Sequence, residues 1–207
     1  MPRKRNVKRL SDPAEIARRF SRGAVMLFPT DTVVGLGCRF DSARGITKIR
    51  EIKGIKDENP LAVLISSIED IDALDVRRSR IFNHLIDKMW PGGLTIVLSS
   101  ETRYACCGNR NTLGLRMPDT DLMRKIIRMS GAPIAATSAN LHGAPPPATI
   151  EEVESEIMKG VDYVLDLPIK GVGLPSTVVK IEAGEVQIIR MGAIPSEEIN
   201  EALRGVV

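Results

Sequence analysis

Short apolar runs, bounded by polar or turn-forming residues, recur along the whole chain. Runs of this length are typical of buried β-strands. They predict strands at 24–28, 61–66, 94–100, 112–117, 133–138, 162–167, 176–181 and 186–191. A turn at Ala183-Gly184 joins the last two runs, so we expect a hairpin there.

Between the strands, apolar residues return every three or four positions, which is the period of a helix. One helix begins after Asp12, with a proline at its first position and Glu15 placed to complete a capping box, and ends at Gly23. A second capping box at Thr149 predicts a helix that runs to Lys159. Further helices are expected at 42–53, 80–90, 121–130 and from 196 onward.

Strands that alternate with helices predict an α/β fold, and the terminal hairpin indicates a mixed sheet. A chain of 207 residues can bury one substantial core. We therefore expect a single domain over 11–207, with a twisted mixed sheet flanked by helices. Residues 1–10, which begin "MPRKRNVKR", are expected to form a flexible basic arm. Such an arm is either simply solvated or in contact with nucleic acid.

Charge and cysteine content narrow the class of protein. The net charge is +3 with a pI near 8.8, which suits an anionic small substrate such as a nucleotide. Cys38, Cys106 and Cys107 form no disulfide framework, and His84 and His142 lack zinc-ligand spacing. No run is long enough to cross a membrane and no signal peptide is evident, so we expect a cytoplasmic protein.

The stretch "FPTDTVVGLG" at 28–37 places hydroxyls, a carboxylate and glycines after the first predicted strand. Ligands of open α/β sheets bind at such strand ends, where Thr30 and Thr32 offer hydroxyls and Gly35 and Gly37 allow close backbone approach. A tight turn, in which the side chains bond their own backbone, explains the same residues equally well. The stretch is neither a Walker A loop nor a dinucleotide fingerprint.

Cations within apolar strands are the next candidates. Arg116 lies in the run "TLGLRM", and strand alternation puts Thr112 and Gly114 on its face. A buried guanidinium needs an anionic partner, which is either a ligand or a structural ion pair. Arg190 has a similar setting in "VQIIRM". Lys53 lies at a predicted helix end, where cations are favourable without any ligand.

Hydroxyl and amide side chains follow two further strands. "AATSANLHG" contains Ser138 and Asn140, and "GVGLPSTVV" contains Ser176. A nucleophile elbow is missing, which argues against serine catalysis. Together these stretches predict a polar cleft with a few cations, suited to positioning and charge stabilisation in phosphoryl or nucleotidyl transfer.

The ordered set "PTDTVVGLG", "KGIKDENPL", "WPGGLT", "LGLRMP", "TSAN", "STVV" and "IIRMGAI" resembles the YrdC-like family of threonylcarbamoyl-AMP synthases. The resemblance covers about residues 13 to 195. It implies a twisted mixed sheet with a concave, positively charged cavity. It also implies synthesis of threonylcarbamoyl-AMP and pyrophosphate from L-threonine, bicarbonate and ATP with Mg²⁺, for modification of an adenosine in tRNA.

The resemblance also implies roles for single residues. Threonine is expected at Thr32, Arg116 and Ser176, with Lys53 and Arg116 as the catalytic pair. The residues expected at ATP are Lys53, Asn59, Thr112, Ser138, Asn140 and Arg190. Downstream threonylcarbamoyl-transfer proteins are implied as partners, tRNA or double-stranded RNA is a further candidate, and no membrane is expected.

The chain departs from the family pattern at a few positions. Ile55 stands where the family usually has an arginine, and Val34 where tyrosine is usual. Ile55 cannot bind phosphate, and neighbouring Lys56 lacks the fork of a guanidinium. Two alternatives therefore stay open beside synthesis: a carbamoyl-adenylate enzyme with another acceptor, and an RNA-binding protein.

Overall fold

The computed structural model describes residues 7–55, 59–108 and 110–206. Its strands form one sheet of ten in the order β1-β8-β2-β3-β7-β4-β6-β5-β9-β10. The strands are β1 (Lys8–Leu10), β2 (Met26–Phe28), β3 (Gly35–Arg39), β4 (Ala62–Leu64), β5 (Leu94–Ser99), β6 (Thr112–Arg116), β7 (Ile134–Ser138), β8 (Tyr163–Leu165), β9 (Thr177–Glu182) and β10 (Glu185–Arg190). The sheet contains parallel pairs such as β4–β6 and β5–β9 as well as antiparallel pairs such as β3–β7. The predicted mixed α/β sheet is confirmed.

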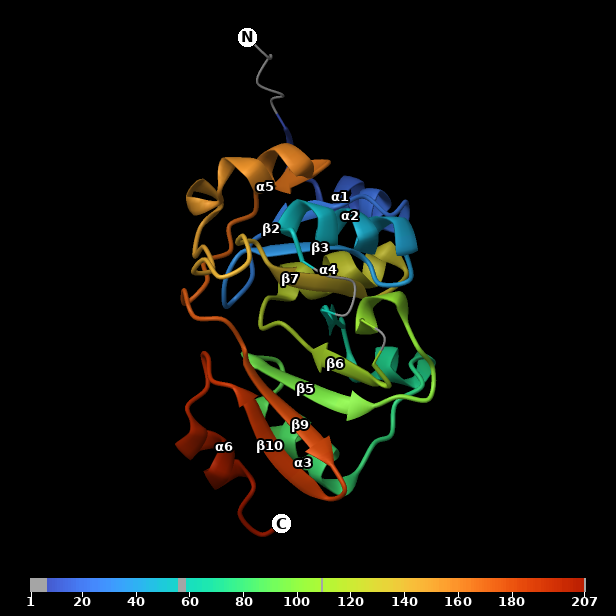
Figure 1. Ribbon diagram of the computed structural model, residues 1–207, viewed down its shortest axis with the longest axis vertical. Coiled ribbons are helices and arrows are strands. Elements are labelled where there is room, and N and C mark those ends of the chain that lie inside the picture. The colour runs from blue at the N-terminus through green and yellow to red at the C-terminus, as the bar shows by residue number, and fades with distance from the viewer. Residues whose placement is uncertain (1–6, 56–58, 109, 207) are drawn as a thin grey trace.

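Helices cover the sheet on both faces (Figure 1). They are α1 (Pro13–Ser21), α2 (Ala43–Lys53), α3 (Arg80–Met89), α4 (Asp121–Ser130), α5 (Ser155–Gly160) and α6 (Ser196–Ala202). Three 3₁₀ turns complete the described part: η1 (Ile68–Ala73), η2 (Ala105–Cys107) and η3 (Ile150–Glu152). No helix within the described ranges is long and apolar enough to cross a membrane.

Strand alternation divides the core between these two faces. Leu27 packs in the larger cluster with residues of α2, whereas Met26 and Phe28 pack with Phe20 of α1 and Ile126 of α4. Consecutive side chains of a strand point to opposite faces, so a fully apolar strand must be covered twice. Burial of both faces fixes β2 and its neighbours, which carry the loop of Thr30 and Thr32.

Local signals in the sequence explain most helix ends. Asp12 caps α1 by accepting from the backbone N–H groups of Ala14 and Glu15 at 3.3 and 3.1 Å. Glu15 does not return to the cap, because its carboxylate binds Arg19 instead. Gly54 ends α2 in the left-handed conformation with φ 62°. The predicted hairpin turn is confirmed, since Ala183 and Gly184 have φ of 51° and 85°.

The strand β3 was missed, because its two glycines were interpreted as places where the backbone approaches a ligand closely. Gly35 and Gly37 instead lie beneath the ring of Phe28, which fills the space of their missing side chains. A Cβ on Gly35 would lie 2.6 Å from Cε2 of that ring, and one on Gly37 would lie 2.7 Å from the carbonyl oxygen of Ala135. Glycine in this strand therefore serves packing.

Two further sequence predictions were wrong in part. Lys8–Leu10 pairs with β8, so the sheet begins inside the predicted arm, and residues 1–6 of that arm lie outside the described residues. The helix predicted at 149–159 is split into η3 and α5 by Val153, which is extended with ψ 128°. Thr149 forms no cap bond, and Glu152 accepts from the N–H of Ala148 at 2.7 Å instead.

Candidate functional site

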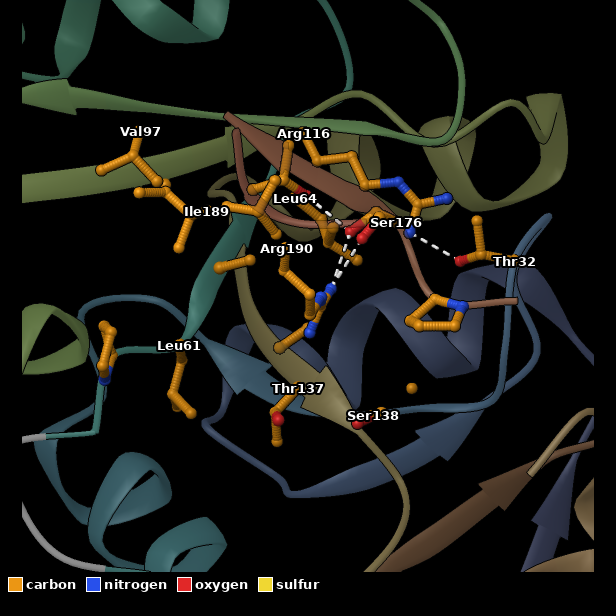
Figure 2. Close-up of a pocket in the computed structure, with 18 of the residues that line it drawn as sticks. Thr32, Leu61, Leu64, Val97, Arg116, Thr137, Ser138, Ser176, Ile189 and Arg190 are labelled. Atoms are coloured by element: carbon orange, nitrogen blue, oxygen red, sulfur yellow. Dashed lines mark hydrogen bonds between the residues drawn. The ribbon is translucent and has the colours of Figure 1, made fainter. Parts of the chain in front are cut away.

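A cavity of about 680 Å³ lies on the sheet face formed by the central and C-terminal strands. Six of the predicted site residues line it: Thr32, Thr112, Arg116, Ser138, Ser176 and Arg190. Figure 2 labels all of these except Thr112. Lys53, Asn59 and Asn140 are not among its lining residues. Segments that are far apart in sequence thus bring most of the expected polar set together. The polar cleft predicted from strand ends therefore exists as one cavity.

Thr30 builds the turn that presents Thr32. Its hydroxyl donates to the carbonyl of Val33 at 2.7 Å and accepts from the N–H groups of Thr32 and Val33 at 3.2 and 3.3 Å. The hydroxyls of Thr30 and Thr32 are 3.0 Å apart. The tight turn is thus confirmed, and it holds the hydroxyl of Thr32 in the cavity wall, where contact with a ligand stays a prediction.

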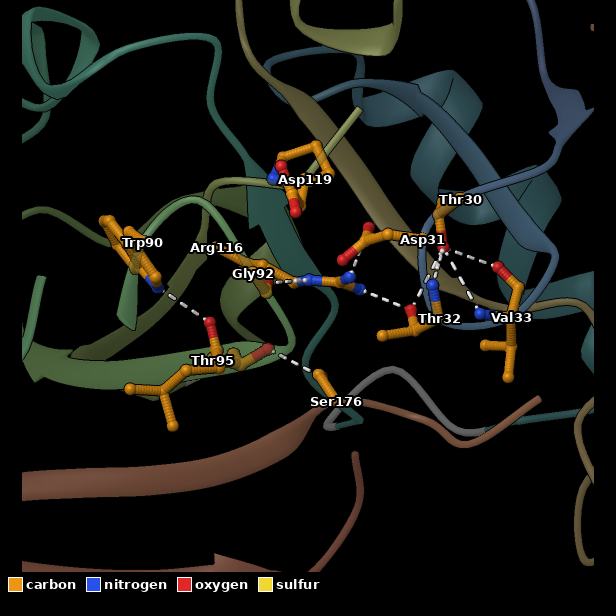
Figure 3. Close-up of polar contacts among 12 residues, drawn as sticks. Thr30, Asp31, Thr32, Val33, Trp90, Gly92, Thr95, Arg116, Asp119 and Ser176 are labelled. Carbon is orange, nitrogen blue, oxygen red and sulfur yellow. Dashed lines mark hydrogen bonds and ion pairs between the residues drawn. The ribbon is translucent and has the colours of Figure 1, made fainter. Parts of the chain in front are cut away.

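Arg116 is the buried cation of the site, and protein acceptors hold its guanidinium in place (Figure 3). Nη2 donates to Asp31 Oδ1 at 2.6 Å, Nη1 to Thr32 Oγ1 at 2.7 Å, and Nε to the carbonyl of Gly92 at 3.0 Å. Burial lowers the pKa of Arg116, and the carboxylate of Asp31 opposes that shift. A guanidinium has five N–H groups, so two remain for a planar anion such as a carboxylate.

Ser176 and Arg190 extend this polar wall from the C-terminal strands. Arg190 donates to the carbonyl of Ser176 at 2.8 Å, and Ser176 Oγ lies 2.8 Å from the hydroxyl of Thr95. Burial lowers the pKa of Arg190, and the positive charge of Arg116 lowers it further. The positive charges of Arg116 and Arg190 repel each other, so binding of an anion between them would be favourable. Thr95 has no sequence signal, since it lies in an ordinary apolar strand.

The segment before Ser176 lies against the turn formed by Thr30 to Val33. The N–H groups of Val172 and Gly173 donate to the carbonyls of Asp31 and Thr32 at 3.0 and 2.8 Å. Gly171 makes the approach possible, because a Cβ there would lie 2.4 Å from the carbonyl oxygen of Thr32. Backbone contacts therefore join the two predicted threonine-binding segments.

Lys53 approaches the site from behind its wall. Its ammonium donates to the backbone carbonyls of Ser138 and Asn140, both at 2.6 Å. Asn140 in turn donates to the carbonyls of Leu141 and Ala144 at 2.9 and 2.7 Å. These bonds hold the segment that carries Ser138 in the cavity wall. Direct contact of Lys53, Asn59 or Asn140 with a nucleotide stays a prediction.

The buried ammonium of Lys53 predicts a specific dependence of stability on pH. Burial lowers the pKa of Lys53 from 10.5 to about 8, against the opposing charge of Glu154. Between these values the unfolded chain binds more protons at this amine, so the free energy of unfolding rises with pH. We expect Lys53→Met to flatten that rise in urea denaturation, whereas Lys125→Met, on an exposed helix face, should not. An equal rise in both variants would contradict this assignment.

Arg110 lines the same cavity and was missed in the sequence. It follows η2 in a polar stretch that is typical of a solvated loop. It is exposed, and its side chain makes no hydrogen bond or ion pair with the other residues that the structure describes. Ile55, by contrast, packs against the apolar core and does not line the cavity. Lys56, the other candidate, lies outside the described residues.

Comparison with known proteins gives consistent matches over nearly the whole chain. A protein-family model described as telomere recombination, and named for Sua5, YciO and YrdC, matches residues 18–192. The threonylcarbamoyl-AMP synthase of Pyrococcus abyssi is 33% identical over 91% of this chain, and that of Bacillus subtilis is 34% identical over 93%. These matches cover 56% and 57% of the two relatives, so the chain spans little more than half of their length.

Solved structures show the same arrangement of elements. Sua5 of P. abyssi, in a crystal structure with L-threonine, superposes with a TM-score of 0.88 at 28% identity, covering 97% of this chain and 61% of that one. YciO of E. coli superposes with a TM-score of 0.79 at 19% identity, covering 93% and 97%. The second likeness concerns the fold alone.

Proposed function

The chain belongs to the Sua5, YciO and YrdC family, and from this premise we propose that it is an L-threonylcarbamoyladenylate synthase, a nucleotidyltransferase. The observation that carries the proposal is the fixed guanidinium of Arg116 beside two hydroxyl-bearing segments. Its remaining N–H groups receive the threonine carboxylate, and Thr32 and Ser176 lie on either side. P. abyssi Sua5, which was solved with L-threonine, supports this choice of substrate.

The proposed reaction needs no covalent intermediate with the protein, because the attacking groups belong to the substrates. The threonine amine attacks the carbon of bicarbonate and water leaves, giving a carbamate. A carbamate oxygen then attacks the α-phosphorus of ATP, and pyrophosphate leaves with the electrons of the broken P–O bond. Arg116 and Arg190 stabilise negative charge in the cavity, and Thr112 and Ser138 offer hydroxyls to the nucleotide.

Magnesium is proposed to enter with ATP. The described residues contain no group of three or more acidic, histidine or cysteine side chains placed to hold a metal ion. Magnesium usually keeps several waters and binds substrate phosphates, so the nucleotide itself is a fitting ligand. When bound, the ion neutralises phosphate charge.

Pyrophosphate release tests the proposal. ATP, Mg²⁺, L-threonine and bicarbonate are supplied together, and threonine and bicarbonate are then omitted in turn. We expect release only when both are present. Release that continues without threonine would refute the synthase, and release with another amino acid in its place would indicate a different acceptor.

Arg110 should contribute to ATP binding, because its exposed guanidinium is free to reach a phosphate group. We expect Arg110→Ala to raise the KM for ATP about tenfold, the loss of one charge-assisted hydrogen bond, and to leave the KM for threonine unchanged. Arg103→Ala is the matched control, since Arg103 bonds Asn111 and does not line the cavity. An unchanged KM for ATP in Arg110→Ala would exclude this role.

A further inference from the structure

The cavity carries one cation that the proposed synthase reaction leaves without a role. Among the described residues, its lining contains four cations and no carboxylate: Arg110, Arg116, Lys180 and Arg190. Lys180 comes from β9 and has no signal in the sequence, since a lysine in a terminal hairpin is ordinary. An excess of positive charge in a cavity attracts an anion with several charges, so each of these cations is expected to face ligand charge.

Strand register places Lys180 beside Arg190 on the cavity face of the sheet. Val178 of β9 pairs with Arg190 of β10, and Lys180 follows Val178 two residues later, so both side chains of β9 point to the same face. All three residues line the cavity. The Cα atoms of such diagonal neighbours lie about 7–8 Å apart. An anion at Arg190 therefore reaches Lys180 when it extends along β9.

The opposite wall of the cavity offers no charge to such an anion. The segment at β4 contributes Pro60, Leu61, Ala62 and Leu64 to the lining. An apolar wall suits a nucleoside, whereas a charge buried against it without a partner is costly. Phosphates that continue from Arg190 are therefore expected on the side of β9.

The ammonium of Lys180 has only a weakly held partner within the described structure. It donates to Glu182 Oε2 at 2.6 Å. The side chain of Glu182 is 62% exposed and does not line the cavity, whereas that of Lys180 is 26% exposed and does. Ion pairs in contact with water contribute little, because water screens them, and an ammonium has three N–H donors. Lys180 can therefore bind a phosphate in the cavity beside Glu182 or in its place.

We propose that Lys180 binds the β- and γ-phosphates of ATP, and hence the pyrophosphate that leaves. The inference rests on the proposed synthase function, in which the α-phosphorus lies near Arg116 and Arg190. When the bond from this phosphorus to the bridging oxygen breaks, its electrons stay on the pyrophosphate. Lys180 stabilises that added negative charge and keeps its own protons throughout.

The test compares binding of ATP and AMP to the full chain by calorimetric titration, with Mg²⁺ and without threonine or bicarbonate. The two nucleotides differ only in the β- and γ-phosphates, so the ratio of their dissociation constants isolates this contact. Lys180→Gln should weaken ATP binding about tenfold, the loss of one charge-assisted hydrogen bond, and leave AMP binding unchanged. Glu182→Gln should instead tighten ATP binding, because it removes the competing carboxylate. Lys125→Gln, at an exposed position of α4, is the matched control and should bind both nucleotides as the wild type does.

Four results would overturn the assignment of Lys180. Equal affinity of the wild type for ATP and AMP would mean that the cavity does not bind the two outer phosphates. Unchanged ATP binding in Lys180→Gln would exclude the contact, and equal weakening of ATP and AMP in that variant would give Lys180 a structural role. An equal loss in Lys125→Gln would show that net charge alone matters.

Thermal melting confirms that the three variants are folded when binding is measured. Because threonine and bicarbonate are left out, the nucleotide titrations do not depend on turnover. Failure of the synthase proposal would appear as pyrophosphate release that continues without threonine, whereas failure of the Lys180 assignment appears only in the ratio of the ATP and AMP dissociation constants.

Discussion

Arg116→Lys should abolish measurable threonine binding while the protein stays folded. Lysine keeps the positive charge but loses the planar fork that bonds Asp31, Thr32 and the carbonyl of Gly92 together. Without those bonds, the cation no longer presents two N–H groups to a carboxylate. Loss of two charge-assisted bonds to the substrate lowers affinity by about 100-fold or more. Calorimetric titration with L-threonine measures the effect directly.

The control for this substitution is Arg39→Lys. Arg39 forms the same kind of two-pronged pair, with Asp41 at 2.6 and 2.9 Å, but it does not line the cavity. That variant should bind threonine as the wild type does. If Arg116→Lys retained wild-type affinity, the fork would serve only to hold the turn at Thr32, and the threonine carboxylate would have to bind elsewhere.

Local patterns in the sequence predict a helix or strand well where its formation depends only on its own residues. The apolar runs give β2, β5 and β6, since a buried strand needs no information from elsewhere. The strand β3 breaks a local rule, because Gly35 and Gly37 are weak strand formers. Their presence is explained by contacts with neighbouring strands, namely the ring of Phe28 and, for Gly37, the carbonyl oxygen of Ala135, and such contacts cannot be read from spacing.

The candidate site likewise contains residues that the sequence predicts and residues that only the fold reveals. Arg116 stands out in sequence because a cation in an apolar strand is costly unless it has a partner. The partner, Asp31, is 85 positions away along the chain and was left without a role. Arg110 gave no signal, because an arginine in a polar stretch is ordinary. The two carbonyls that the ammonium of Lys53 binds gave no signal either, because only the fold brings them near, and the expected contact of Lys53 with ATP stays a prediction.

Gly192→Ala should be strongly destabilising, because among the glycines of the described ranges this one has the closest approach to a neighbouring atom. A Cβ at this position would lie 2.1 Å from the carbonyl oxygen of Pro175 and 2.6 Å from the carbonyl carbon of Ser176. Both neighbours are backbone atoms, so no change of rotamer relieves the contact. The N–H of Ala193 already donates to the same carbonyl at 2.8 Å, so a separation of the two segments would also break this hydrogen bond. We expect the free energy of unfolding to fall by about 3 kcal/mol in urea denaturation.

Displacement of Ser176 should also weaken threonine binding in Gly192→Ala, because Ser176 would move away from Thr95 and Arg190. Gly114→Ala is the matched control for stability. A Cβ on Gly114 would meet Thr95 and Val97 at 3.5 and 3.6 Å, which is ordinary contact. Its free energy of unfolding should stay within about 1 kcal/mol of the wild type. Equal stability of the two variants would mean that the backbone near Pro175 yields, and that the close approach there does not fix the position of Ser176.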